Sequence, residues 1–201
     1  MALVVRDLAF AHPGREPLFR AATLRVEAGT VVGLTGPSGV GKSTFAALLA
    51  GDLRPASGEI QVDGRPLPRR GFRPVQLIHQ HPELAVNPRW RMRSVLDEAG
   101  RPSRETLDRI GIRPDWLERF PEELSGGELQ RFCIARALQP GTRYLVVDEL
   151  TAMFDALTQA GIWHTLLDLV RDRGLGLLAI SHEPALLDRV CDDQISIERL
   201  R

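Results

Sequence analysis

The sequence predicts an α/β domain with a parallel sheet, an antiparallel β portion at its N-terminus and an inserted helical subdomain. Strand-like and helix-like segments alternate over residues 30–51 and again from residue 144 onward, which is typical of parallel sheets covered by helices. The chain opens with short β-rich segments separated by Pro-Gly and Ala-Gly turns, which favours antiparallel pairing. From about residue 82 to residue 138 the pattern is helical and polar, which indicates the inserted subdomain.

Local patterns place the individual elements. Before the helical subdomain we expect strands at residues 2–10, 18–29, 30–36, 59–64 and 73–80. A helix is expected to begin near Lys42 and to end at Gly51. After the subdomain we expect a helix over about residues 155–173, a second short helix, and strands at residues 144–149, 176–182 and 193–201. Ligands of such sheets bind at the carboxyl ends of the parallel strands.

The composition excludes several classes of protein. A length of 201 residues fits one domain, residues 1–201, with the subdomain at about 82–138 inserted into it. Acidic and basic residues number 26 each, so we expect no nucleic-acid partner. We find neither a signal peptide nor an apolar run of membrane-spanning length, so we expect a cytoplasmic protein. Cys133 and Cys191 lie far apart, which argues against a disulfide framework or a zinc site.

A glycine-rich segment after the strand at residues 30–36 predicts a phosphate-binding loop. The loop consists of Gly36, Pro37, Ser38, Gly39, Val40, Gly41, Lys42, Ser43 and Thr44, and a helix follows it. Glycines let successive N–H groups point at phosphate oxygens, the single lysine of the chain can reach the outer phosphates, and Ser43 can supply a hydroxyl to Mg²⁺. An accidental glycine-rich turn is the alternative, but the strand before it and the helix after it favour a nucleotide site.

Two adjacent carboxylates end the apolar run at residues 145–147. Asp148 and Glu149 stand at the carboxyl end of a buried strand, where a magnesium nucleotide would bind. We expect Asp148 to hold Mg²⁺, directly or through water, and Glu149 to orient and polarise the attacking water. The alternative is a strand end capped by solvated acids, but the presence of the phosphate-binding loop disfavours this interpretation.

The stretch LSGGELQR, residues 124–131, separates the classes of nucleotide-binding protein. Ser125, Gly126, Gly127 and Glu128 begin a predicted helix, and an exposed helix N-terminus can bind anions. A serine N-cap followed by glycines is the ordinary reading of such a stretch. Together with the phosphate-binding loop, however, it resembles the signature of the ATP-binding cassette (ABC) family. The resemblance covers essentially the whole chain and implies a P-loop NTPase core of the ABC type.

The resemblance implies further site residues and cofactors. Gln80 is similar to the Q-loop glutamine, Asp155 to the D-loop aspartate and His182 to the switch histidine that contacts the γ-phosphate. ATP and Mg²⁺ are the implied cofactors, with Ser43, Gln80 and Asp148 as metal ligands and Glu149, His182 and Gln80 as catalytic residues. His12 stands where the family usually has an aromatic residue that stacks on adenine, so we expect weaker or pH-sensitive binding of the base.

One local segment indicates a subfamily. QHPELAVNPRWRM, residues 80–92, resembles the Q-loop segment of ATPases that power peptide and nickel import. This resemblance implies separate transmembrane permease subunits, a second ABC ATPase as homo- or heterodimer partner, an extracytoplasmic substrate-binding protein, and a peripheral position on the inner face of the cell membrane. A polar loop between a strand and a helix is the alternative for this segment. ABC ATPases of DNA repair or translation, and a small-molecule P-loop kinase, are the alternatives for the chain.

Overall fold

Two β-sheets organise the chain in the computed structural model, which describes residues 1–98, 100–150 and 156–201. The antiparallel sheet has the order β2-β1-β4-β5 and comprises β1 Ala2–Ala11, β2 Pro17–Glu27, β4 Ser57–Val62 and β5 Arg65–Pro66. The parallel sheet has the order β6-β7-β8-β3-β9 and comprises β3 Val31–Thr35, β6 Val75–Ile78, β7 Tyr144–Asp148, β8 Gly176–Ile180 and β9 Asp193–Ser196. This arrangement confirms the predicted α/β class with an N-terminal antiparallel portion.

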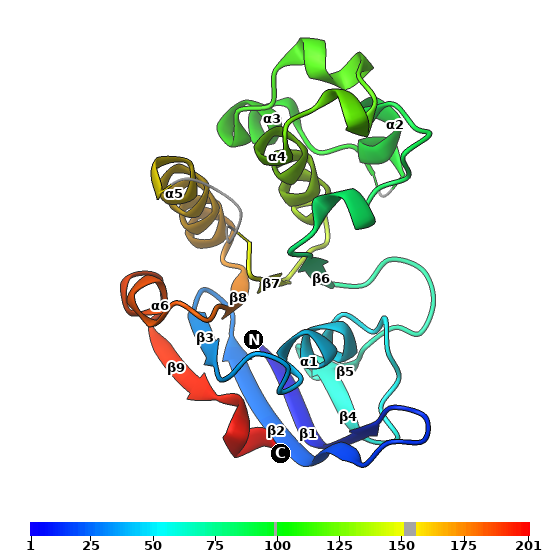
Figure 1. Ribbon diagram of the computed structural model, residues 1–201, viewed down its shortest axis with the longest axis vertical. Coiled ribbons are helices and arrows are strands. Elements are labelled where there is room, and N and C mark those ends of the chain that lie inside the picture. The colour runs from blue at the N-terminus through cyan, green and yellow to red at the C-terminus, as the bar shows by residue number, and fades with distance from the viewer. Residues whose placement is uncertain (99, 151–155) are drawn as a thin grey trace.

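Helices cover the parallel sheet on both faces (Figure 1). Between β6 and β7 the chain forms a helical lobe of η1 Pro82–Leu84, α2 Met92–Asp97, α3 Arg104–Ile110, η2 Pro114–Glu118, η3 Pro121–Glu123 and α4 Gly126–Ala137. Outside the lobe lie α1 Lys42–Leu49, α5 Ala156–Arg173 and α6 Pro184–Val190. Across the described residues, no helix combines the length and apolar character that crossing a bilayer requires.

Two hydrophobic clusters lie on opposite faces of the parallel sheet. One joins the helical lobe and α5 to the sheet, and the other fills the space between the sheet, α1 and the antiparallel strands. Successive residues of β7 point to opposite faces, so Leu145 and Val147 belong to the first cluster while Tyr144 and Val146 belong to the second. Burial on both faces explains why this strand reads as a continuous apolar run.

The C-terminal segment differs from the prediction. The strand expected at residues 193–201 ends at Ser196, and a 3₁₀ helix, η4 Ile197–Leu200, follows it. The Ser196 hydroxyl accepts a hydrogen bond from the Glu198 N–H at 3.3 Å and caps this turn. Ile197 and Leu200 are buried in the second cluster, so the turn brings both side chains inward, where a strand would have pointed alternate residues to opposite faces.

Candidate functional site

The loop between β3 and α1 curls around its own lysine. Lys42 is only 6% exposed, and its Nζ donates hydrogen bonds to the carbonyl oxygens of Gly36 at 2.8 Å and Pro37 at 2.9 Å. An ammonium group has three N–H donors, so one remains for a ligand. The structure therefore fixes the side chain of the predicted phosphate-binding lysine inside the loop.

Glycine is required at the two ends of this loop. Gly36 has a φ of 147° and Gly41 a φ of 111°, conformations that other residues rarely adopt. A Cβ at Gly36 would lie 2.6 Å from Cγ2 of Ile197, and one at Gly41 would lie 2.7 Å from Cδ2 of Leu18. Val40, between them, packs against the second core cluster. Glycine is therefore needed at Gly36 and Gly41 for two reasons: the backbone there has a positive φ, and a side chain would collide with its neighbours.

A cavity of about 350 Å³ opens beside the loop, a size suited to a small-molecule ligand. Its lining brings together residues from three separate parts of the chain: Ser38, Gly39, Gly41, Lys42, Ser43, Thr44, Gln80 and Glu149. The structure thus places the predicted Q-loop glutamine and the predicted general base against the phosphate-binding loop.

Asp148 ends β7 as a buried carboxylate, 7% exposed. Burial raises the pKa of Asp148, and the negative charge of Glu149 adds to this effect. A hydrogen bond from Ser43 and the positive charge of Lys42 oppose the rise in this pKa without cancelling it. A buried carboxylate with incomplete compensation is a favourable place for a cation.

Glu149 is held on both of its carboxylate oxygens. Oε2 accepts a hydrogen bond from Gln80 Nε2 at 3.0 Å, and Oε1 lies 3.2 Å from Nδ1 of His182. The side chain of Glu149 is 18% exposed and that of His182 is 51% exposed. The Glu149 N–H donates to the carbonyl of Ile180 at 3.0 Å, with Glu149 at a φ of 48°, so the backbone also fixes this side chain at the strand end. The structure therefore joins three predicted catalytic residues in one contact group.

The oxygen donors around the cavity fit a magnesium ion. Ser43 lines the cavity, and its hydroxyl lies close enough to Asp148 to lower the pKa of that carboxylate. The Gln80 amide nitrogen is occupied by Glu149, which leaves its carbonyl oxygen for a cation. Hydroxyl, carboxylate and amide oxygens are ligands that Mg²⁺ accepts alongside water and phosphate oxygens.

The signature residues lie away from this cavity. Ser125 caps α4, its hydroxyl accepting the Glu128 N–H at 3.3 Å, while Glu128 Oε2 accepts the Ser125 N–H at 2.7 Å. The Ser125 backbone N–H lowers the pKa of Glu128, so this carboxylate is committed to the helix cap. Gly126 and Gly127 form the first turn of α4 in the helical lobe (Figure 1). None of these four residues lines the cavity beside the phosphate-binding loop.

His12 and Asp155 are the remaining predicted site residues. His12 lies beside the phosphate-binding loop, with Nε2 at 3.4 Å from Thr44 Oγ1, and its ring meets Phe10 edge-on at a centroid distance of 5.0 Å. The side chain of His12 is partly exposed. Asp155, the predicted D-loop aspartate, lies outside the described residues.

Sequence reasoning missed His79. This residue directly precedes Gln80, and its positive form would lower the pKa of Asp148. Its side chain also lines a second cavity of about 630 Å³ between the core and the helical lobe. Only its place beside Gln80 could have drawn attention to it in the sequence.

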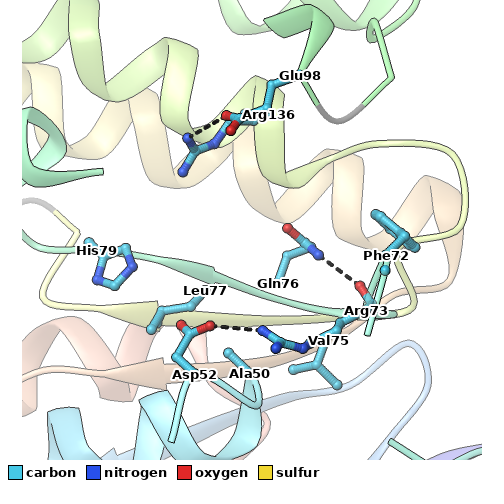
Figure 2. Close-up of a pocket in the computed structure, with 11 residues that line it drawn as sticks. Ala50, Asp52, Phe72, Arg73, Val75, Gln76, Leu77, His79, Glu98 and Arg136 are labelled. Atoms are coloured by element: carbon cyan, nitrogen blue, oxygen red, sulfur yellow. Dashed lines mark hydrogen bonds and ion pairs between the residues drawn. The ribbon is translucent and has the colours of Figure 1, made fainter. Parts of the chain in front are cut away.

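The second cavity borders the edge strand β6 (Figure 2). The lobe contributes Glu98 and Arg136, whose side chains lie 3.7 Å apart, and the core contributes Asp52 and Arg73, which pair at 3.0 Å. His79 lies at one end of this cavity in Figure 2. The cavity is therefore a polar cleft with both signs of charge, distinct from the cavity at the phosphate-binding loop.

Comparisons with known proteins identify the family of this chain. The chain matches the ABC transporter family over residues 19–152. The nickel import ATP-binding protein NikE of Rhodospirillum rubrum is 39% identical, over 92% of this chain and 75% of the relative. A Brucella abortus protein named for peptide import is 36% identical, over 93% of this chain and 64% of the relative. The dimeric ATP-binding cassette MJ0796, solved with ADP and Pi, has a TM-score of 0.79 at 22% identity, over 98% of this chain and 94% of that one.

These matches confirm the family resemblance inferred from the signature and from the Q-loop segment, and they do not favour a role in DNA repair or translation. The structural likeness, at low identity, supports the fold. The chain belongs to the ABC transporter family, as an ATP-binding subunit that hydrolyses ATP.

Proposed function

We propose that this chain powers import through separate permease subunits, with Glu149 as the general base for ATP hydrolysis. The observation that carries the assignment is the position of Glu149, which lines the phosphate-loop cavity while Gln80 and His182 hold its two oxygens. A carboxylate fixed in this way can orient a water molecule at low entropic cost.

The phosphate-binding loop would hold the ATP phosphates. Backbone N–H groups at the start of α1 and the remaining N–H of Lys42 offer charge-assisted hydrogen bonds to phosphate oxygens. Ser43, Asp148 and Gln80 would hold Mg²⁺ next to them. When bound, this ion would neutralise negative charge on the phosphates. His12 would lie against the adenine base.

Glu149 retains the capacity to accept a proton in the arrangement observed. A carboxylate offers about four lone-pair positions; Gln80 takes one of them on Oε2, and Oε1 lies 3.2 Å from Nδ1 of His182. A water molecule that attacks the γ-phosphorus can therefore donate to Glu149 without prior rupture of either contact. His182, exposed on one side, can turn its other ring nitrogen to the γ-phosphate.

A Glu149→Gln variant tests the assigned base. The amide keeps the size of the side chain but cannot accept a proton, so we expect ATP turnover to fall by at least roughly a hundredfold while ATP binding persists. Glu105→Gln, on an exposed position of α3, is the matched control and should retain turnover. Normal ATPase activity in Glu149→Gln would show that the base is another group.

We infer that two such domains close head to tail around two ATP molecules. The signature residues Ser125, Gly126 and Gly127 do not line the cavity of their own chain, which supports a role against the nucleotide of a partner domain. The partner would be a second copy or a second ABC ATPase. Glu149→Gln with Mg·ATP should then accumulate as a dimer in size-exclusion chromatography, and Ser125→Arg should prevent this dimer without loss of ATP binding to the monomer.

The cleft in Figure 2 is our candidate contact for a permease subunit. It lies between core and lobe, and His79 links it to Gln80, so an occupant could shift the glutamine that holds Glu149. Such a contact would place the protein peripherally on the cytoplasmic face of the membrane. Nickel, metal chelates or peptides are the proposed cargo; of these, nickel and peptides appear in the names of the relatives given above.

Affinity purification of Glu149→Gln from the native host with Mg·ATP tests this role. We expect two multi-span permeases and a second ABC ATPase, and a genetically linked extracytoplasmic binding protein could then be screened against nickel and peptides. Recovery of ribosomal or DNA-repair proteins without any membrane protein would refute the transport role and leave the ATP site intact.

A further inference from the structure

Four exposed arginines lie on the segment between α1 and β6, which includes β4 and β5. Arg54, Arg65, Arg69 and Arg70, here called the arginine patch, are all exposed. Within the described part of the chain, none of them has an ion-pair partner, whereas many of the other arginines pair with a carboxylate. Figure 1 shows this segment, from β4 and β5 to the long loop before β6, at one side of the molecule.

The acids of the same segment are already engaged elsewhere. Residues 52–73 carry five arginines and three carboxylates. Asp52 pairs with Arg73 at 3.0 Å, Glu59 lies 3.6 Å from Arg6, and Asp63 accepts a hydrogen bond from the Tyr144 hydroxyl at 2.8 Å. No carboxylate of the segment therefore neutralises the arginine patch.

A cavity of about 600 Å³ borders the patch. Arg54 and Arg69 line it together with Arg73, whose Nε is buried and finds no acceptor among the described residues. Asp52 and Glu59 also line it, but each is paired with an arginine outside the patch. An anion at this place would meet at least two guanidinium groups, and the planar guanidinium matches the oxygens of a phosphate. Phe72, 43% exposed, directly precedes Arg73 in the sequence and adds an apolar group beside the charges.

We propose that the arginine patch binds the phosphate groups of anionic phospholipids and so fixes this face of the subunit against a membrane surface. Pro66 in β5 and Pro68 just after it restrict the backbone and so lower the entropic cost of holding the arginines outward. Since the whole chain balances at 26 acidic and 26 basic residues, the remainder has a slight excess of acid and is repelled by the same surface. This uneven distribution of charge would turn the arginine patch toward the membrane surface.

The patch is an extended set of separate charges before β4, in β5 and in the loop after β5, with the exposed ring of Phe72 in the same loop. A planar array of headgroups can meet all four arginines at once, whereas an acidic peptide would need several spaced carboxylates to do the same. The inference rests on the proposed transport role only in so far as that role places the subunit beside a membrane.

Vesicle co-sedimentation of the full nucleotide-free chain tests the proposal. The probes are phosphatidylcholine vesicles and mixed phosphatidylcholine–phosphatidylglycerol vesicles, each at low and high salt. We expect binding only to the mixed vesicles and loss of that binding at high salt. The variant Arg54→Gln/Arg65→Gln/Arg69→Gln/Arg70→Gln should bind roughly six hundredfold more weakly, since each of the four arginines near an anionic surface contributes about fivefold.

The matched control removes the same charge elsewhere, at Arg20, Arg171, Arg189 and Arg199, which are exposed and have no ion-pair partner among the described residues. It should bind almost as the native chain does. Equal losses in the two variants, or no binding by the native chain, would overturn the proposal. If the native chain does not bind either kind of vesicle, and the patch variant no longer co-purifies with permeases in the affinity purification, an acidic protein surface is the ligand and the lipid assignment is wrong. ATPase activity should persist in both variants; its absence in the native chain would count against the proposed function instead.

Discussion

Substitution of Gly176 by alanine tests how the two sheets are joined. Gly176 begins β8, and a Cβ there would lie 2.5 Å from Cδ1 of Tyr144 and 2.7 Å from the carbonyl oxygen of Glu27. Neither neighbour can retreat, because Tyr144 is 1% exposed and its hydroxyl is bonded to Asp63, while the Glu27 oxygen belongs to the backbone of β2. Overpacking of a core costs typically 1–3 kcal/mol, and we expect about 3 kcal/mol here because both neighbours are fixed.

The assay is thermal and urea unfolding followed by circular dichroism. For a chain of this size, about 3 kcal/mol corresponds to a fall in Tm of roughly 6–12 °C. Gly161→Ala is the control, because this glycine is exposed on α5 and no atom lies within 4 Å of its Cβ position. Alanine there should stabilise the helix by about 0.5–1 kcal/mol. Equal stability of Gly176→Ala and the native chain would refute the reasoning that this contact fixes the sheets against each other.

Three further predictions concern the site. Burial raises the pKa of Asp148, so the charged carboxylate lowers the free energy of unfolding at pH values above this pKa. Below the pKa that Asp148 has in the unfolded chain, this loss of stability disappears. Asp148→Asn should therefore raise the Tm of the nucleotide-free chain at pH 7.5, and a lower Tm would contradict this. The same variant should lose most of the stabilisation that Mg·ATP provides. Ser125→Ala removes the side-chain half of the α4 cap and should lower the free energy of unfolding by about 1 kcal/mol in urea titrations, with Glu128 keeping its bond to the Ser125 N–H. His12→Tyr should tighten nucleotide binding and abolish any difference between about pH 5.5 and pH 8 in fluorescence titrations; unchanged affinity at both values would remove His12 from the base site.

Local signals in the sequence were sufficient for much of the site. The glycines, lysine and serine of residues 36–44 predict a phosphate-binding loop because their chemistry is confined to one turn between a strand and a helix. The apolar run before Asp148 predicts a strand buried on both faces, and the structure agrees. The serine and glutamate three residues apart at the signature match the capping box that begins α4. The 3₁₀ turn at Ile197–Leu200 was missed, since its burial depends on the antiparallel sheet beneath it.

The sequence by itself determined the fold class, the phosphate-binding loop and the family signature, because each depends on backbone preferences and hydrogen bonds between residues close in the chain. Tertiary structure alone decided that Gln80 and His182 each hold one oxygen of Glu149, since the three residues follow different strands of the sheet. It alone decided which arginines are left unpaired, because the acids of residues 52–73 find partners at both near and distant positions. Contacts of that kind depend on how strands pack side by side, which the spacing of residues along the chain does not encode.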